Sequence, residues 1–403
     1  MLTVAEARAR ILSRIPVLDS EPVELLESRD RVLAEEVRAV RDVPPFTNSA
    51  MDGYALRASD IAPASGERPV ELRLLGEVRA GFPAALAVEQ GSAIRIMTGA
   101  MLPHGADAVV RVEDTAEADG RVAIRVPVGT GVNVRSAGTD VAAGSVVAAP
   151  GRLVTPGLIG VLASAGRDTV RCIRRPRVLV LSTGDELRNA GEPLKPGQIT
   201  NTNRYTLLAA LDSVGAIGLD GGVAPDERWV LAERLEGARD ADLIVTTGGV
   251  SMGAYDLVRS LLEEQDSVDF WQVALRPGKP LIFGSFRGVP LIGLPGNPVS
   301  TLVGFELFVK PALRQMQGRK DSEPALLPAT TEERLAAIPG LEQYLRGVAR
   351  RHSGRLLVRL TGNQGSHVLR SMADANCLVR VPPGEGELPA GSAVEVIPLA
   401  PLD

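Results

Sequence analysis

Four short apolar segments, each running into a turn of glycine and small polar residues, decide the fold of this chain: Val178-Leu-Val-Leu-Ser182, Leu243-Ile-Val-Thr246, Leu275 before the turn Arg276-Pro-Gly-Lys-Pro280, and Pro290-Leu-Ile-Gly-Leu294. Apolar segments this short, separated by helical stretches, are typical of buried parallel strands. In an open α/β sheet, ligands bind beyond the carboxyl ends of such strands. The sequence therefore predicts that carboxylates, hydroxyls, backbone amides and a lysine meet at one sheet edge, as in a phosphate and metal site.

Further domains are predicted on both sides of this α/β region. A capping box at Thr3 and Glu6 begins a helix that ends near Ile15, and an amphipathic pattern predicts a second helix over residues 23–40. Alternating short runs between residues 46 and 135, and again beyond residue 320, are typical of two small β-domains. The remaining helices are expected over residues 155–164, 204–214, 227–236, 255–264 and 299–317.

The composition excludes several classes of protein. The chain has 403 residues, enough for about two to four domains. Its net charge of −5 argues against general nucleic-acid binding. Two distant cysteines and three scattered histidines do not form a disulfide framework or a zinc site. The first residues lack a signal-peptide pattern, and no apolar run is long enough to cross a bilayer, so we expect a soluble cytoplasmic protein without membrane contact.

Two acidic residues follow the first apolar run. Ser182-Thr-Gly-Asp-Glu-Leu187 places Asp185 and Glu186 at a predicted strand end. Carboxylates in this position bind Mg²⁺ directly or through water. The same pattern also fits a helix N-cap with acids in the first turn, so these residues alone leave both interpretations open.

Three glycine-containing turns are candidates for anion binding. Thr247-Gly-Gly-Val-Ser-Met-Gly253 resembles a backbone nest whose amides and hydroxyls face an anion. Asp256 follows it, as a metal ligand or a helix cap. Arg276-Pro-Gly-Lys-Pro280 carries two cations on a loop stiffened by prolines, which favours anion binding over solvated charge. Pro295-Gly-Asn-Pro-Val-Ser300 begins a helix whose N-terminus suits a phosphate.

Eight short motifs occur in series along the chain: Asn48-Ser-Ala-Met-Asp-Gly-Tyr-Ala55, Met97-Thr-Gly-Ala100, Gly105-Ala-Asp-Ala-Val-Val110, Ser182-Thr-Gly-Asp-Glu-Leu187, Gly197-Gln-Ile-Thr-Asn-Thr-Asn203, Thr247-Gly-Gly-Val-Ser-Met-Gly253, Arg276-Pro-Gly-Lys-Pro280 and Gly293-Leu-Pro-Gly-Asn-Pro-Val-Ser300. Each motif alone is weakly specific, but the ordered set is highly specific and covers essentially the whole chain. Together they resemble the MoeA family of molybdopterin molybdenumtransferases, which is similar to the E domain of gephyrin.

The resemblance implies a fold, an assembly and a reaction. The fold is multidomain α/β plus β: an elongated N-terminal domain (residues 1–45 and 136–175), an inserted β-domain (46–135), a three-layer α/β molybdopterin-binding domain (176–320) and a C-terminal β-barrel (321–403). The assembly is a cytoplasmic homodimer. The reaction is insertion of molybdate, a substrate, into adenylylated molybdopterin, with Mg²⁺ as cofactor and release of AMP. An adenylyltransferase that supplies the substrate is an expected partner.

The resemblance also assigns roles to residues that match its motifs. Mg²⁺ and the substrate's phosphates would be held by Asp185, Glu186, Asp226 and Asp256, which with Lys279 form the expected catalytic set. Arg276 and Lys279 would bind molybdate or phosphate. Asp52 and Thr98 would reach the site from the other subunit. The remaining substrate-binding residues would be Ser182, Thr183, Gly184, Thr247, Gly248, Gly249, Ser251, Pro295, Gly296, Asn297, Pro298, Ser300, Ser366 and Ser371.

Two residues depart from the family pattern, and two other functions remain open. Arg276 stands where lysine is common, which keeps the charge but changes its geometry. Cys377 stands where glycine is usual, which leaves the conformation of that turn undetermined. The alternatives are the adenylyltransferase, which shares the α/β domain but lacks the flanking β-domains, and a gephyrin-like scaffold without catalysis. Nothing in the sequence separates molybdate from tungstate.

Overall fold

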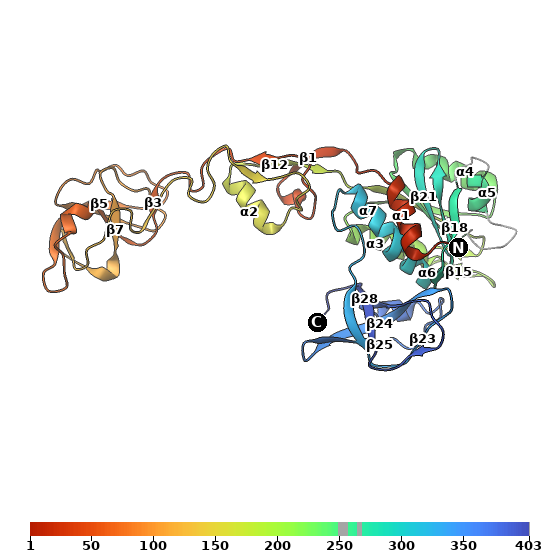
Figure 1. Ribbon diagram of the computed structural model, residues 1–403. Coiled ribbons are helices and arrows are strands. Elements are labelled where there is room, and N and C mark those ends of the chain that lie inside the picture. Colours follow the sequence, from red (N-terminus) through yellow and green to blue (C-terminus); the bar gives the residue numbers. More distant parts are fainter. Residues whose placement is uncertain (249–256, 264–267, 403) are drawn as a thin grey trace. The chain divides into compact units, whose positions relative to one another are not determined.

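The computed structural model describes residues 1–248, 257–263 and 268–402, which divide into two compact units. The larger unit consists of Met1–Glu21 and Ile173–Asp403, and the inserted unit consists of Pro22–Cys172. Figure 1 traces the elements of both units. Among the described helices, none combines the length and the apolar character needed to span a membrane.

A six-stranded sheet forms the centre of the larger unit. Its first four strands are parallel and the last two are antiparallel to their neighbours. Three of the four segments that decided the sequence interpretation are adjacent parallel strands, as predicted. In spatial order the sheet contains β16 (Ile217–Ala224), β13 (Arg177–Thr183), β17 (Leu243–Thr247), β21 (Val289–Leu294), β20 (Pro280–Phe286) and β18 (Val268–Gln272).

Helices cover both faces of this sheet because its strands are apolar on both sides. Val178 and Val180 of β13 belong to one buried cluster, and the alternate residues Leu179 and Leu181 belong to another. This alternation follows from the two-residue repeat of a strand. The first cluster includes α1 (Val4–Arg14), α3 (Thr202–Ser213), α6 (Pro298–Gly304), a π-helical turn (Phe305–Val309) and α7 (Lys310–Met316), and the second includes α4 (Arg228–Glu236) and α5 (Leu257–Glu263).

The expectation that Leu275 ends a strand of the parallel set is wrong. Leu275 and Arg276 form β19 (Leu275–Arg276), which pairs with β24 (Glu342–His352) of the C-terminal domain. The following strand, β20, runs antiparallel to β21, so it begins at the edge where the parallel strands end. The turn between Arg276 and Pro280 therefore still lies at the predicted edge.

A closed barrel of five strands forms the C-terminal part. β24 pairs with both β25 and β26, and this double pairing closes the sheet. The expected C-terminal β-barrel is confirmed. Around the barrel the strands are β24, β25 (Arg355–Leu360), β22 (Leu327–Thr331), β28 (Ala393–Pro398) and β26 (Cys377–Val381), with a short helix α8 (Arg370–Ala373) before β26.

The inserted unit contains a second six-stranded sheet and a smaller helical part. The alternating runs predicted between residues 46 and 135 are strands of this sheet. The helix expected over residues 155–164 is α2 (Pro156–Ser164), and Thr155 is its N-cap. In spatial order the sheet contains β7 (Ala108–Arg111), β4 (Gly53–Leu56), β6 (Ser92–Ile96), β5 (Val70–Val78), β9 (Arg121–Ile124) and β8 (Thr115–Ala118).

The predicted helix over residues 23–40 is wrong. The segment instead forms β1 (Ser20–Glu24), a 3₁₀ turn (Leu26–Ser28) and β2 (Val37–Arg38). Asp30 has a φ of 62°, which interrupts a right-handed helix. Strand pairing with β11 (Val146–Ala148) and β12 (Thr169–Ile173) buries the apolar residues that the helical pattern had counted. Distant partners thus decided the local structure.

Candidate functional site

A cavity of about 470 Å³ lies at the carboxyl edge of the α/β sheet, and we call it the neutral cavity. The ends of β13, β17 and β21 contribute to its wall, together with the start of α3 and the turn before β20. Glu186 is the single charged residue among the described residues of its lining. The lining consists of Ser182, Thr183, Glu186, Leu187, Ile199, Asn201, Asn203, Thr247, Gly248, Gly278, Pro280, Pro295, Gly296, Asn297 and Ser300.

Two glycines at this edge have a positive φ, a backbone conformation that other residues rarely adopt. Gly248 has a φ of +87°, and a Cβ there would lie 2.5 Å from the Thr183 carbonyl oxygen. Gly184 has a φ of +145°, and a Cβ there would lie 2.4 Å from Oε2 of Glu186. A side chain at position 248 would meet the backbone of β13 and push the two strand ends apart, whereas one at position 184 would meet only the flexible end of the Glu186 side chain. Gly248 therefore allows β13 and β17 to end side by side at the cavity.

Asn203 joins two of the turns that form the neutral cavity. Its Nδ2 donates to Oγ1 of Thr247 at 2.7 Å and to the carbonyl oxygen of Gly296 at 2.8 Å. Thr301 Oγ1 donates to the carbonyl oxygen of Pro295 at 2.6 Å, which fixes the second of these turns from the side of α6. The turns after β17 and β21 are thus held in one arrangement by buried hydrogen bonds.

Three buried polar atoms of the cavity lining have no hydrogen-bond partner in the described part of the chain: Oγ1 of Thr183, Nδ2 of Asn201 and Oδ1 of Asn203. Buried polar groups are nearly always paired, so unpaired ones indicate a water or ligand partner. Asn201 and Asn203 were not among the predicted site residues. Their signal was two asparagines just before the helix predicted over residues 204–214, and Asn201 is the N-cap of α3.

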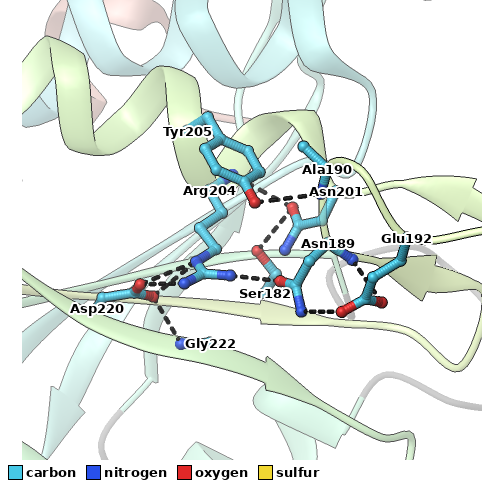
Figure 2. A network of polar contacts seen from close by, with 9 residues as sticks. All are labelled: Ser182, Asn189, Ala190, Glu192, Asn201, Arg204, Tyr205, Asp220 and Gly222. Carbon is cyan, nitrogen blue, oxygen red and sulfur yellow. Dashed lines mark hydrogen bonds and ion pairs between the residues drawn. The ribbon is translucent and has the colours of Figure 1, made fainter.

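A polar network ties the rim of the neutral cavity to α3 (Figure 2). Arg204 forms an ion pair with Asp220 of β16 and donates to the side-chain oxygen of Asn189 in the rim loop. The hydroxyl of Tyr205 accepts from the backbone N–H of Ala190 at 3.1 Å. The hydrogen bond from Arg204 also lowers the pKa of Asp220. These contacts hold the segment between β14 (Leu187–Arg188) and β15 (Ile199–Thr200) over α3.

A second cavity, of about 390 Å³, lies where the turn after β19 meets the barrel, and we call it the basic cavity. Asn297 Nδ2, from the neutral cavity, donates to Oγ of Ser366 in the basic cavity at 3.1 Å. The basic cavity is lined by Arg276, Pro277, Arg334, Leu335, Ala336, Ile338, Gln343, Leu345, Arg346, Leu360, Gln364, Gly365 and Ser366.

Arg346 is the most informative residue of the basic cavity, and sequence reasoning missed it. Its side chain is fully buried, with Nε donating to Ser371 Oγ at 3.0 Å and Nη2 donating to the Gly365 carbonyl at 3.1 Å. Nη1 has no partner, and no carboxylate pairs with this guanidinium, among the residues that the structure describes. Burial lowers the pKa of Arg346 to about 10. An uncompensated buried cation of this kind is suited to bind an anion.

Carboxylates gather beside the neutral cavity. The backbone N–H of Asp226 donates to Oδ1 of Asp185 at 3.1 Å. Partial burial, followed by the negative charges of Asp185 and Glu186, raises the pKa of Asp226. Carboxylate oxygens that repel one another are the type of ligand that a hard cation such as Mg²⁺ prefers. However, within residues 1–248, 257–263 and 268–402, no three His, Cys, Asp or Glu side chains are arranged as a metal site.

The remaining predicted residues lie in several places. Gly249, Ser251 and Asp256 lie outside the described residues. Lys279 is exposed between two residues of the neutral cavity, and Pro298 begins α6. In the inserted unit, Thr98 donates to Oδ1 of Asp52 from its backbone N–H at 2.6 Å and its hydroxyl at 2.8 Å, which lowers the pKa of Asp52.

The chain does not need a glycine at position 377, where it departs from the family pattern. Cys377 is buried at the start of β26, and its backbone does not have a positive φ. The preceding Asn376 fixes the turn, because its side chain accepts from the Ala349 N–H at 2.7 Å and donates to the Ala349 carbonyl at 2.8 Å. Burial raises the pKa of Cys377 to about 12, so the thiol is neutral at ordinary pH.

Replacing Asp226 by asparagine is expected to raise thermal stability slightly when no divalent cation is present. A carboxyl whose folded pKa is raised stabilises the fold below its unfolded pKa and loses that contribution as pH rises through the folded pKa. The melting temperature of Asp226→Asn should therefore exceed that of wild type by about 1 °C at pH 8, with a smaller difference at pH 4. Mg²⁺ should raise the wild-type melting temperature more than that of the variant. Equal Mg²⁺ effects on both proteins would contradict a cation at this residue.

Three family profiles together match nearly the whole chain. They are the MoeA N-terminal region (domain I and II) over residues 2–166, the probable molybdopterin binding domain over residues 179–315, and the MoeA C-terminal region (domain IV) over residues 328–399. The central match covers nearly all of the α/β sheet and the last match covers the barrel, whereas the first match joins the inserted unit to the N-terminal segment of the larger unit.

Curated relatives and solved structures agree with these matches. The chain is 38% identical to the molybdopterin molybdenumtransferase of Haemophilus influenzae, covering 99% of this chain and 98% of the relative. It is 39% identical to molybdopterin molybdenumtransferase 2 of Mycobacterium tuberculosis, covering 93% and 94%. A crystal structure of the molybdopterin biosynthesis MoeA protein from Pyrococcus horikoshii superposes with a TM-score of 0.84 at 32% identity, over 100% of both chains. The chain therefore belongs to the MoeA family of molybdopterin molybdenumtransferases and is a transferase of molybdenum cofactor biosynthesis.

Proposed function

We propose that this chain inserts molybdate into adenylylated molybdopterin in a Mg²⁺-dependent reaction that releases AMP. The observation that carries the proposal is the basic cavity, where the buried Arg346 has no compensating carboxylate among the described residues. A dianionic oxyanion is a suitable partner for this guanidinium together with Arg276 and Arg334. The neutral cavity beside it offers room for an organic substrate.

The basic cavity would bind the oxyanion, and the neutral cavity would bind the organic substrate. Arg276, Arg334 and Arg346 hold and orient the oxyanion, while Ser366 forms the hydrogen-bonded link to Asn297 in the neutral cavity. Asp185 and Asp226, with Glu186 and Asp256, would hold Mg²⁺. The ion held there would supply positive charge to offset negative charge on the substrate's phosphate groups. Lys279 lies in the same turn as Arg276, and its exposed side chain adds a further positive charge that can reach a bound anion.

The proposal includes an assembly and a location. We propose a cytoplasmic homodimer in which Asp52 and Thr98 complete the site of the other subunit. The two hydrogen bonds from Thr98 hold the Asp52 carboxylate in one orientation and lower its pKa. A neighbouring adenylyltransferase would supply the adenylylated substrate. The division into an elongated N-terminal domain, an inserted β-domain, an α/β domain and a barrel remains a prediction at its stated boundaries.

A comparison of substrates tests this function. Purified chain is given either adenylylated molybdopterin with Mg²⁺ and molybdate, or molybdopterin with ATP and Mg²⁺. The proposal predicts AMP release and metal insertion in the first mixture, and no pyrophosphate in the second. Pyrophosphate formation from ATP without metal insertion would identify an adenylyltransferase instead.

Replacing Arg276 by alanine is expected to raise the molybdate concentration for half-maximal rate about tenfold, because a charge-assisted contact in the basic cavity is lost. The KM for the adenylylated pterin should change by less than about twofold, since the proposal places that substrate in the neutral cavity. Arg276→Lys retains the cation and should restore most of the molybdate affinity. Initial rates at varied molybdate and varied pterin substrate separate the two constants. Equal increases in both would contradict a specific role in oxyanion binding.

A further inference from the structure

The side chain of Asn201 has one fixed orientation in the wall of the neutral cavity. The backbone N–H of Arg204 can only donate, and it lies 3.2 Å from Oδ1 of Asn201. Ser182 Oγ donates to the same oxygen at 3.2 Å. In Figure 2 the amide oxygen of Asn201 is directed toward Ser182. The hydrogen-bond network thus identifies the other amide atom as Nδ2, a donor that is buried and unpaired in the described structure.

The orientation of Asn203 is fixed in the opposite sense. The carbonyl oxygen of Gly296 can only accept, and it lies 2.8 Å from Nδ2 of Asn203. The remaining amide atom, Oδ1, is therefore an acceptor, and it too is buried without a partner among the described residues. Asn201 is 2% exposed and Asn203 is 8% exposed, so neither unpaired atom is part of the open surface. A ligand in this cavity must offer an acceptor to one asparagine and a donor to the other.

The other residues of the cavity favour an uncharged ligand over a simple anion. Arg and Lys are absent from its described lining, so no cationic side chain of that lining would pair with a phosphate. Four apolar side chains provide surfaces for a flat ring: Leu187, Ile199, Pro280 and Pro295. A fully ionised phosphate has acceptors only and would leave Oδ1 of Asn203 unpaired. A neutral heteroaromatic ring with an amide-like edge satisfies both asparagines and covers the apolar walls.

We propose that Asn201 and Asn203 bind the pyrimidinone edge of the pterin ring. This inference rests on the proposed function for the identity of the substrate. The pterin edge carries a carbonyl oxygen for Nδ2 of Asn201 and adjacent N–H donors for Oδ1 of Asn203, with the unpaired Oγ1 of Thr183 as a further acceptor. The adenine of AMP also carries a donor and an acceptor, but it presents a single amino donor at its pairing edge. The acceptor-rich wall therefore favours the pterin.

Asn201 can be changed without loss of its structural role. Asn201→Asp keeps an oxygen for the Arg204 N–H at the start of α3, and aspartate is a good N-cap. It replaces the donor Nδ2 by an acceptor. Asn201→Ser also keeps an N-cap oxygen and lacks the donor, but it adds no charge. Both variants should retain the wild-type melting temperature within about 2 °C.

The test measures binding of unsubstituted pterin by its fluorescence and of AMP by calorimetry, both with Mg²⁺ present. We expect both Asn201 variants to weaken pterin binding about tenfold, because the ligand's buried carbonyl loses its donor. AMP affinity should change by less than about twofold in Asn201→Ser. Equal effects of the aspartate and serine variants on pterin would assign the loss to the missing donor, not to the added charge.

Three results would overturn the inference: no pterin binding by the wild-type chain, wild-type pterin affinity in both variants, or a loss confined to AMP. The last result would place the nucleotide in the neutral cavity. The test of this inference and the test of the proposed function can give different results. If pterin binding depends on Asn201 but the chain inserts no metal, the proposed function is wrong and the pterin site is supported. If the chain inserts metal and both variants keep wild-type pterin affinity, the proposed function is supported and the pterin site is wrong.

Discussion

Replacing Asp185 by asparagine is expected to lower the rate of AMP release at least about 100-fold while the fold is retained. Asp185 accepts the backbone N–H of Asp226 and lies with it at the edge where the parallel strands end. The asparagine still offers an oxygen to that N–H, but the negative charge that attracts Mg²⁺ is lost. Removal of one such electrostatic group typically costs about 10²–10³ in rate. Single-turnover assays with preformed adenylylated molybdopterin measure the effect.

A control variant separates the metal role from a general loss of charge. Asp212 is an exposed carboxylate of α3 outside both cavities, and Asp212→Asn should retain the wild-type rate. Higher Mg²⁺ concentrations should partly restore Asp185→Asn, because weaker binding can be offset by mass action. A near-normal rate in Asp185→Asn, with the fold verified, would show that Asp185 has only a structural role at the strand end.

Mixing two inactive variants is expected to restore activity to roughly a quarter of wild type. Asp52→Ala would damage the site of the other subunit, and Asp185→Asn would damage its own. After random subunit exchange about half of the dimers are mixed, and each has one intact site and one site with both defects. Half of the dimers with one of two sites active gives a quarter of the activity. Each variant alone should remain strongly impaired.

The exchange itself must be measured independently, for example by energy transfer between labelled subunits. A mixture of two Asp52→Ala preparations, labelled separately, provides the control and should show exchange without recovery. Verified exchange of the two different variants with no recovery would mean that Asp52 acts in its own subunit or only stabilises the turn with Thr98.

The sheet could be predicted because each of its parallel strands has a recognisable local sequence pattern. Val178–Ser182, Leu243–Thr246 and Pro290–Leu294 are continuously apolar, as strands buried on both faces must be, and each ends in a glycine turn. Residues 23–40 had no such local determinant. Their helical periodicity was real, but pairing with β11 and β12 from more than 100 residues away decided their structure.

Some residues of the candidate site could likewise be predicted from local motifs, and others could not. Glu186, Thr247 and Asn297 lie in short contiguous motifs, so the topology of a parallel sheet was enough to bring them together. Arg346 could not be found in this way, because it occurs in a strand with two other arginines and no local pattern distinguishes the buried one. Its burial results from barrel closure and from the contacts of Gly365 and Ser371, both distant in sequence.

The most direct test of the account is the ratio of molybdenum inserted to AMP released in a single turnover. Wild-type chain in excess is mixed with adenylylated molybdopterin, Mg²⁺ and molybdate. Metal bound to the pterin and free AMP are then determined in the same samples over time. Coupled insertion predicts equal amounts at every time point, and little AMP when molybdate is omitted. AMP released at the same rate without molybdate, or with no metal bound to the pterin, would contradict insertion as the function of this chain.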